Sequence, residues 1–204
     1  MNKIITISRE FGSGGRELGK RIAEILEIAY YDNEIITAIA DKSGIGEEYV
    51  KSIIERTPIT YFPNTIGRSF HTTVNPQLTL NAKIYGEQHN IIKELAKESD
   101  CLLIGRCSDY ILKEYNPLKI FIYADKDARL ERCRQNALNN EHLSDAQIRV
   151  KIKEIDKNRA KYYNFFTGQK WGEKENYDLC INTTQRKIKD LSNPISELVK
   201  TMLY

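Results

Sequence analysis

A glycine-rich turn near the beginning of the chain joins an apolar strand to an amphipathic helix, and its sequence is SREFGSGGRELG over residues 8–19. Glycines reach positive φ angles and carry no Cβ, so consecutive backbone N–H groups can turn inward around an anion. The helix that follows has Leu18, Ile22 and Ile25 on one face, and its N-terminus directs a positive dipole at the same place. The turn therefore predicts a phosphate site. Its residues are Gly12, Ser13, Gly14, Gly15, Arg16 and Glu17.

The turn departs from the P-loop pattern G-x-x-x-x-G-K-[ST] in two places. With the guanidinium of Arg16 at the lysine position, the pattern requires a glycine where the chain has Glu10 and a hydroxyl where it has Glu17. Losing the hydroxyl removes the usual side-chain ligand for Mg²⁺, so the metal would need other partners or more water. The dinucleotide pattern G-x-G-x-x-G fails because its third glycine falls on Glu17. A glycine turn that binds no ligand is the alternative.

Composition limits the class of protein. The 204 residues favour one domain over 1–204, and a net charge of +3 with mixed signs does not indicate a nucleic-acid surface. No apolar run approaches the ~20 residues that span a bilayer, and the first residues hold charges and glycines where a secretory signal has an apolar run. The four cysteines form no CxxC pair, and no cysteine and histidine spacing fits zinc. We expect a reduced, cytoplasmic protein with no membrane span.

Apolar runs alternate with helical periods, which predicts a doubly wound α/β fold with a parallel sheet that binds ligands at the carboxyl ends of its strands. The expected strands are 3–8, 29–31, 101–105, 118–123 and 177–182. The expected helices follow the glycine turn and then span 34–41, 47–56, 78–98, 126–139, 145–166 and 194–203. Ser144 and Gln147 form a capping box ahead of the helix at 145. Segment 57–77, which contains three prolines, is expected to be irregular and lid-like.

Several motifs occur in the order that a known family has. They are the first strand with its glycine turn (5–16), Tyr31-Asp32, IGRCSD (104–109), KIFI (119–122), Arg129 with Arg132, Asp156 with Arg159, Tyr162-Tyr163, Thr167-Gly168, Trp171-Gly172 and 177–183. In this set the chain resembles the cytidylate-kinase-like branch of the P-loop nucleoside monophosphate kinases, from the first strand through Thr184. The resemblance implies a five-stranded parallel sheet of order 2-3-1-4-5 flanked by helices. It also implies a helical acceptor-side insertion over 32–98 and a lid over 132–149.

The resemblance implies ATP on the glycine turn, Mg²⁺ with it, and a nucleotide acceptor opposite. Cytidylate kinases end the strand before this acceptor site in Asp-Gly-Arg-Asp, whereas this chain has Ile104 and Cys107 at the two aspartate positions. Asp109, two residues later, could partly substitute. The departures leave two interpretations open, either that magnesium is handled differently or that catalytic competence is reduced.

Arginines supply the positive charge that phosphoryl transfer needs. Arg106 follows the central strand, where the ligand crevice of such a sheet lies, and is expected to contact the acceptor phosphate. The alternative is an ion pair of Arg106 with Asp109 or Glu10. By resemblance, Asp156 orients Arg159 as a phosphate ligand; the alternative is a surface pair of the two.

Of the other charged side chains on the predicted helices, some are expected to have a functional role and others to be exposed to solvent. By resemblance Arg132 belongs to the lid and stabilises charge in the transition state, whereas Arg129 and Arg149 are expected to be solvated. Asp32 follows the second strand and is expected to cap the next helix, which is compatible with a contact to the acceptor. The predicted catalytic residues are Arg16, Arg132 and Arg159. The predicted substrate-binding residues are Asp32, Arg106, Asp109 and Asp156.

These expectations describe an ATP-dependent kinase that acts on cytidylate or a related nucleoside monophosphate. Its partners would be small nucleotides rather than a nucleic-acid polymer. Two alternatives stay open, a kinase for a different small acceptor and a regulatory protein that binds nucleotide without transferring phosphate. The sequence leaves the oligomeric state open.

Overall fold

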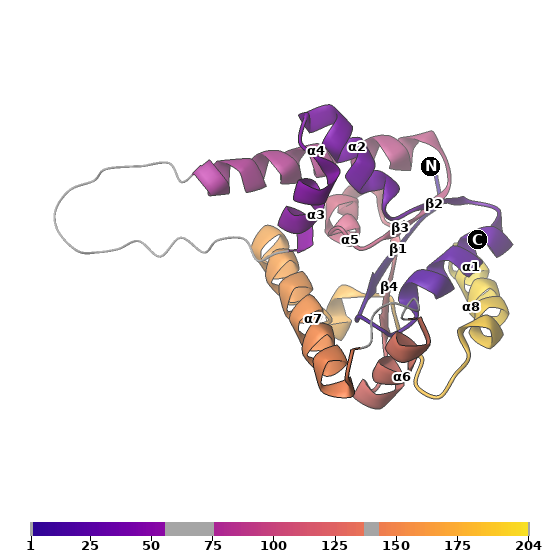
Figure 1. The fold of residues 1–204 in the computed structure, drawn as a ribbon. Coiled ribbons are helices and arrows are strands. Elements are labelled where there is room, and N and C mark those ends of the chain that lie inside the picture. Colours follow the sequence, from indigo (N-terminus) through magenta and orange to yellow (C-terminus); the bar gives the residue numbers. More distant parts are fainter. Residues whose placement is uncertain (1, 56–75, 137–142, 204) are drawn as a thin grey trace.

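A computed structural model describes residues 2–55, 76–136 and 143–203 of the chain. Five parallel strands form a sheet with helices on both faces (Figure 1). The strands are β1 (Ile4–Arg9), β2 (Ala29–Tyr31), β3 (Cys101–Ile104), β4 (Leu118–Tyr123) and β5 (Leu179–Asn182). Their order, β2-β3-β1-β4-β5, confirms the predicted doubly wound sheet.

The helices cover most of the remaining described chain. They are α1 (Gly15–Leu26), α2 (Glu34–Ser43), α3 (Glu47–Glu55), α4 (Pro76–Glu98), α5 (Ser108–Ile111), α6 (Lys126–Asn136), α7 (Asp145–Thr167) and α8 (Ile188–Leu203), with 3-10 turns at Lys113–Tyr115 and Lys174–Asn176. The predicted start of the last helix at Pro194 is wrong, because the buried residues Ile188 and Ser192 extend the same packed face toward the N-terminus. The single turn of α5 was not predicted.

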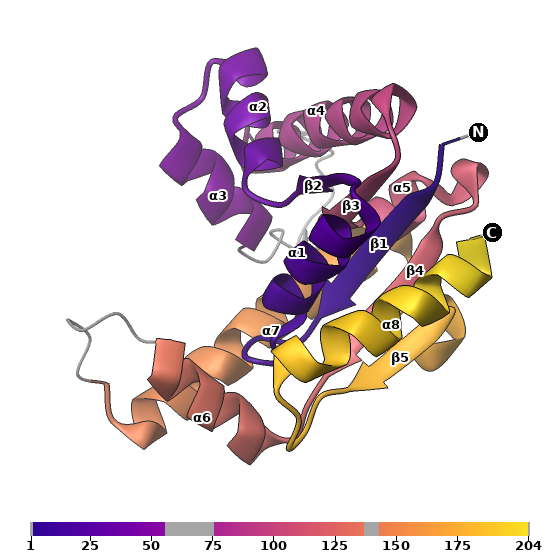
Figure 2. The ribbon, with the colours of Figure 1, turned by 90° about the vertical axis from the view of Figure 1, so that its right-hand side faces the viewer.

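The central strands contribute to two cores, one on each face of the sheet, because successive side chains of a strand point to opposite faces. On one face Ile5 and Ile7 pack with apolar side chains of α1 and α8. On the other face Ile4 and Leu103 pack with those of α2, α3, α4 and α7. Figure 2 shows α1 and α8 together over one face, and α2, α3 and α4 gathered on the side of the molecule where β2 lies. The sheet therefore places the carboxyl ends of β1 and β3 next to each other, beside the turn that leads into α1.

Two predicted segments are described only in part. Of segment 57–77, only 76 and 77 are described, and they already belong to α4. Of the predicted lid 132–149, residues 137–142 lie outside, and the described ends belong to α6 and α7.

The capping box that opens α7 is confirmed. The backbone N–H of Ser144 donates to Gln147 Oε1 at 2.8 Å, and the N–H of Gln147 donates to Ser144 Oγ at 3.4 Å. This fixes the start of α7, the helix that carries Asp156 and Arg159. None of the described helices combines the length and apolarity needed to cross a membrane.

Candidate phosphate-binding site

The glycine turn presents backbone amides at the N-terminus of α1. Gly12 and Gly14 have φ angles of 77° and 81°, which glycine adopts without strain, and Gly14 is the N-cap of the helix. Within the described residues, no acceptor receives a hydrogen bond from the amides of Gly12, Gly14, Gly15 or Arg16. Inward-facing amides at a helix N-terminus bind anions. The turn thus has the backbone geometry that the predicted phosphate site requires.

The connection between β5 and α8 holds the carbonyl side of this turn. Ser13 is fully buried, and its carbonyl accepts a hydrogen bond from the Thr183 hydroxyl at 2.7 Å. Arg132 donates to the carbonyls of Ser13 at 3.4 Å, of Arg186 at 3.1 Å, and of Thr183. In this conformation Arg132 joins two loops, and the catalytic role predicted for it would require an exchange of these acceptors.

A buried ion network fixes the residues that enter the turn. Arg129 of α6 is 6% exposed, contacts Asp156, and lies 3.1 Å from Glu10 Oε2. Its Nε donates to the Phe11 carbonyl at 2.7 Å, while the Phe11 N–H donates to Asp156 Oδ1 at 2.8 Å. The prediction that Arg129 is solvated is therefore wrong, because two carboxylates compensate its desolvation. Arg149 is exposed, as predicted.

Asp32 pairs with arginines at the end of β2. This carboxylate is buried; its Oδ2 lies 2.5 Å from Arg16 Nε, and its Oδ1 lies 3.8 Å from Arg9 Nη2. The predicted capping role is wrong, because Asn33 is the N-cap of α2 and no side chain makes a capping bond there. Arg16 consequently extends from the glycine turn toward the end of β2.

Arg106 lies in an unusual turn after β3. Gly105, Arg106 and Cys107 have consecutive left-handed φ angles of 66°, 61° and 55°. The side chain of Gln88 in α4 donates to the Arg106 carbonyl at 2.8 Å and holds this turn in place. Because left-handed backbone costs energy for residues other than glycine, such turns persist where packing enforces them, and they are frequent at functional sites.

The charges of Arg16, Arg106 and Arg159 all act on Arg9 near the carboxyl ends of β1 and β3, and we call these four residues the arginine cluster. Burial, and then the positive charge of Arg159, lower the pKa of Arg9, while Asp32 opposes this effect. Such a concentration of positive charge attracts anions. Sequence reasoning missed Arg9, although a basic residue at the end of a buried strand was a usable signal.

Asp109 of α5 is hydrogen-bonded to a tyrosine of α7. It is 4% exposed, and its Oδ2 accepts a hydrogen bond from the Tyr163 hydroxyl at 2.6 Å. Burial raises the pKa of Asp109; the bond from Tyr163 and the charge of Lys119 oppose that rise. The substrate contact predicted for Asp109 stays a prediction, and in this conformation its carboxylate serves the packing of α5 against α7.

Asp109→Asn should stabilise the protein at neutral pH. Because the pKa of Asp109 is raised in the folded state, the fold holds this proton more tightly than the unfolded chain, and stability falls as pH rises between the two pKa values. Asparagine removes that penalty and keeps an oxygen for Tyr163, so the free energy of unfolding should rise by about 1 kcal/mol at neutral pH. Urea denaturation of both proteins at neutral and acid pH measures this. A variant that is less stable at neutral pH would show that the charge is needed.

The side chains around the turn do not form a protein-built magnesium site. Within the described residues, no three acidic, histidine or cysteine side chains gather as a metal-binding group. The carboxylates of Glu10, Glu17, Asp32 and Asp156 all pair with arginines. The predicted Mg²⁺ stays a prediction.

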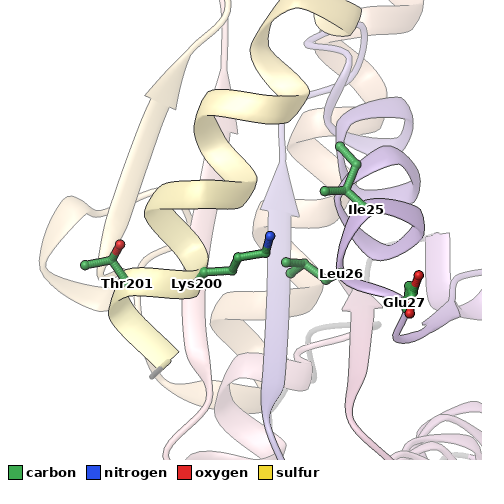
Figure 3. Close-up of a pocket in the computed structure, with 5 residues that line it drawn as sticks. All are labelled: Ile25, Leu26, Glu27, Lys200 and Thr201. Carbon is green, nitrogen blue, oxygen red and sulfur yellow. The ribbon is translucent and has the colours of Figure 1, made fainter.

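A surface hollow lies at the other end of α1 (Figure 3). It is lined by Ile25, Leu26 and Glu27 at the end of α1 and by Lys200 and Thr201 of α8. The hollow lies at the C-terminal end of α1 and the glycine turn at its N-terminal end, which at the usual helical rise places them roughly 15 Å apart. The hollow is thus distinct from the phosphate-binding site.

Solved structures share this fold. An uncharacterized protein from Eubacterium ventriosum is 26% identical, with a TM-score of 0.69 over 98% of this chain and 99% of that chain. A shikimate kinase from Bacteroides thetaiotaomicron is 14% identical, with a TM-score of 0.57 over 97% of this chain and 98% of that chain. A shikimate kinase from Acinetobacter baumannii, in complex with shikimate, is 15% identical, with a TM-score of 0.55 over 99% and 95%. The chain has the P-loop kinase fold.

The sequence also matches a family model. No curated protein matches the chain, but the model described as the cytidylate kinase-like family matches residues 4–185. This range includes the whole sheet, the glycine turn and every member of the arginine cluster. The match covers most of the chain and agrees with its strand order, so this chain belongs to the cytidylate kinase-like family.

Proposed function

We propose that this protein is an ATP-dependent phosphotransferase whose acceptor is cytidylate or a related nucleoside monophosphate. The observation that carries this proposal is the position of the arginine cluster beside the amides of the glycine turn. Phosphoryl transfer brings two anions together and spreads negative charge over the transferred group, so catalysis depends on fixed positive charge. Membership of the cytidylate kinase-like family supports the same reaction class.

The proposed roles follow from position. The amides of residues 12–16 would bind ATP phosphates, and Arg106 at the end of β3 would bind the acceptor phosphate. Arg159 donates from Nη1 to the Arg9 carbonyl at 3.1 Å, and its guanidinium lies 5.6 Å from the centre of the Phe11 ring. Held against the turn in this way, Arg159 would stabilise charge on the transferring group. Asp156 lies 3.6 Å from Arg159 and also accepts from Phe11, so it would orient both.

Two other functions are supported by particular features. A different small acceptor is favoured by Ile104 and Cys107, which are buried apolar residues where cytidylate kinases have aspartates. A regulatory nucleotide-binding role is favoured by the pairing of every carboxylate around the turn with arginine. Measured turnover separates the kinases from the regulatory protein.

A panel of acceptors tests the proposal. The purified protein would be given ATP, Mg²⁺ and each of the common ribo- and deoxyribonucleoside monophosphates, with shikimate as an acceptor of another class, and ADP formation would be followed. We expect cytidylate or a close relative to give the highest kcat/KM. Preferred transfer to shikimate would favour the different acceptor. No ADP formation above that of an Arg159→Ala variant with any acceptor would overturn the kinase proposal.

Arg16→Ala should weaken ATP binding by about 1–3 kcal/mol, the usual cost of losing a charge-assisted contact. Arg16 is exposed and begins next to the amides of the turn, so truncation should leave the fold intact. Calorimetric titration with ATP measures the loss. Lys20→Ala, one helical turn further along the exposed face of α1, is the matched control. Equal affinities of the two variants would show that Arg16 serves only its pair with Asp32.

A further inference from the structure

The start of α1 fixes how the turn aligns with the P-loop pattern. In the order strand, G-x-x-x-x-G-K-[ST], helix, the last glycine precedes the helix and the lysine opens it. Gly14 is the N-cap of α1 and Gly15 is its first residue. The alignment is therefore one residue earlier than the sequence suggested. Arg9 occupies the first glycine position, Gly15 the lysine position and Arg16 the hydroxyl position.

The two exchanged residues, Arg9 and Gly15, are in contact. A Cβ added to Gly15 would lie 2.7 Å from the Cβ of Arg9 and 3.1 Å from its Cγ, closer than such atoms pack. Gly15 is not among the glycines with positive φ, so its backbone does not require glycine. The stem of Arg9 is the reason that no side chain fits at position 15.

The guanidinium of Arg9 extends from Gly15 to the crevice. Its Nη1 lies against Gly105, at a point where a Cβ on that residue would collide with it. The Arg9 side chain is 12% exposed, and its nearest carboxylate oxygen, on Asp32, is 3.8 Å away, beyond hydrogen-bond distance. Within the described chain, this guanidinium donates no hydrogen bond to another residue. A largely buried cation with five N–H donors is costly unless an anion completes its bonding.

We propose that Arg9 replaces the P-loop lysine and binds a phosphate oxygen of the nucleotide held on the glycine turn. The positive charge belongs to a side chain at the end of β1 that passes beside Gly15, whereas the lysine of a standard P-loop belongs to the first turn of the helix. A guanidinium at this position offers two parallel N–H groups to a phosphate, which an ammonium cannot. That the ligand is ATP rests on the proposed function, whereas the binding of phosphate by Arg9 does not depend on it.

Arg9→Met tests this assignment by calorimetric titration with ATP and with inorganic triphosphate. Both affinities should fall at least about tenfold. The melting temperature should stay unchanged or rise, because the variant removes a poorly paired buried cation. Arg149→Met, which changes an exposed arginine in the same way, is the control and should keep wild-type affinity. A structural role for Arg9 would lower the melting temperature and leave the affinities unchanged.

A charge-relocation variant tests the geometry. Arg9→Gly should lose affinity for ATP, and Arg9→Gly with Gly15→Lys, which restores the first glycine and the lysine of the pattern, should recover most of it. Gly15→Lys alone should destabilise the fold, because Arg9 already fills that space. Arg9→Met that binds as tightly as Arg149→Met would overturn the inference, as would a folded double variant that binds no better than Arg9→Gly. Binding that depends on Arg9 without phosphate transfer would instead overturn only the proposed function.

Discussion

Arg159→Ala is expected to lower turnover about a hundredfold or more while the affinity for ATP stays within a few-fold. Arg159 donates to the Arg9 carbonyl at 3.1 Å and lies over the Phe11 ring, so its charge is fixed beside the turn before substrate binds. A fixed cation stabilises negative charge that develops on the transferring group more than charge already present in ATP. The loss should therefore appear in kcat rather than in binding.

Steady-state kinetics with the preferred acceptor, together with ATP titrations, measure this split. Arg159→Lys should recover only part of the rate, because lysine lacks the planar fork of donors. Lys161→Ala, an exposed position two residues further along α7, is the control and should retain wild-type turnover. A rise in the KM for ATP with kcat unchanged would instead make Arg159 a ground-state phosphate ligand.

The three inner strands could be predicted because their own composition indicates their burial, whereas the edge strands β2 and β5 are only partly buried. Every residue of β3 is buried, and β1 and β4 are nearly so, which gives the continuous apolar runs that parallel strands show. The start of α8 was mispredicted for a different reason. The helix begins before Pro194 because Ile188 packs in the same core as the apolar side chains of α1.

The candidate site was only partly predictable, because ion pairing depends on which elements the sheet brings together. The glycine turn and the nearness of Asp156 to Arg159 follow from local spacing. The partner of Arg129 does not, since Glu10 lies far away in the chain and meets α6 only after β1 and β4 pair. The contact of Arg9 with Gly105 could not be predicted for the same reason, because it forms only when β1 and β3 lie side by side.

Arg129→Met should lower the free energy of unfolding by about 3–5 kcal/mol, because it leaves two carboxylates without their buried cation. Arg129 is 6% exposed, lies 3.1 Å from Glu10, contacts Asp156 and donates to the Phe11 carbonyl at 2.7 Å. For a chain of this size the melting temperature should fall by roughly 6–20 °C. Arg134→Met changes an exposed arginine of the same helix and should have little effect.

A further variant distinguishes unpaired charge from lost packing as the cause of this fall in stability. If uncompensated charge is responsible, replacing Glu10 and Asp156 by glutamine and asparagine in the Arg129→Met background should restore part of the stability, because burying neutral amides costs less than burying unpaired carboxylates. The restored variant should still bind ATP weakly, since the bonds that Arg129 and Asp156 make to Phe11 position the glycine turn. Arg129→Met that melts within a degree or so of Arg134→Met would contradict this account. In that case the turn would be held by Thr183 and Arg132, which bind the carbonyl of Ser13 on its other side.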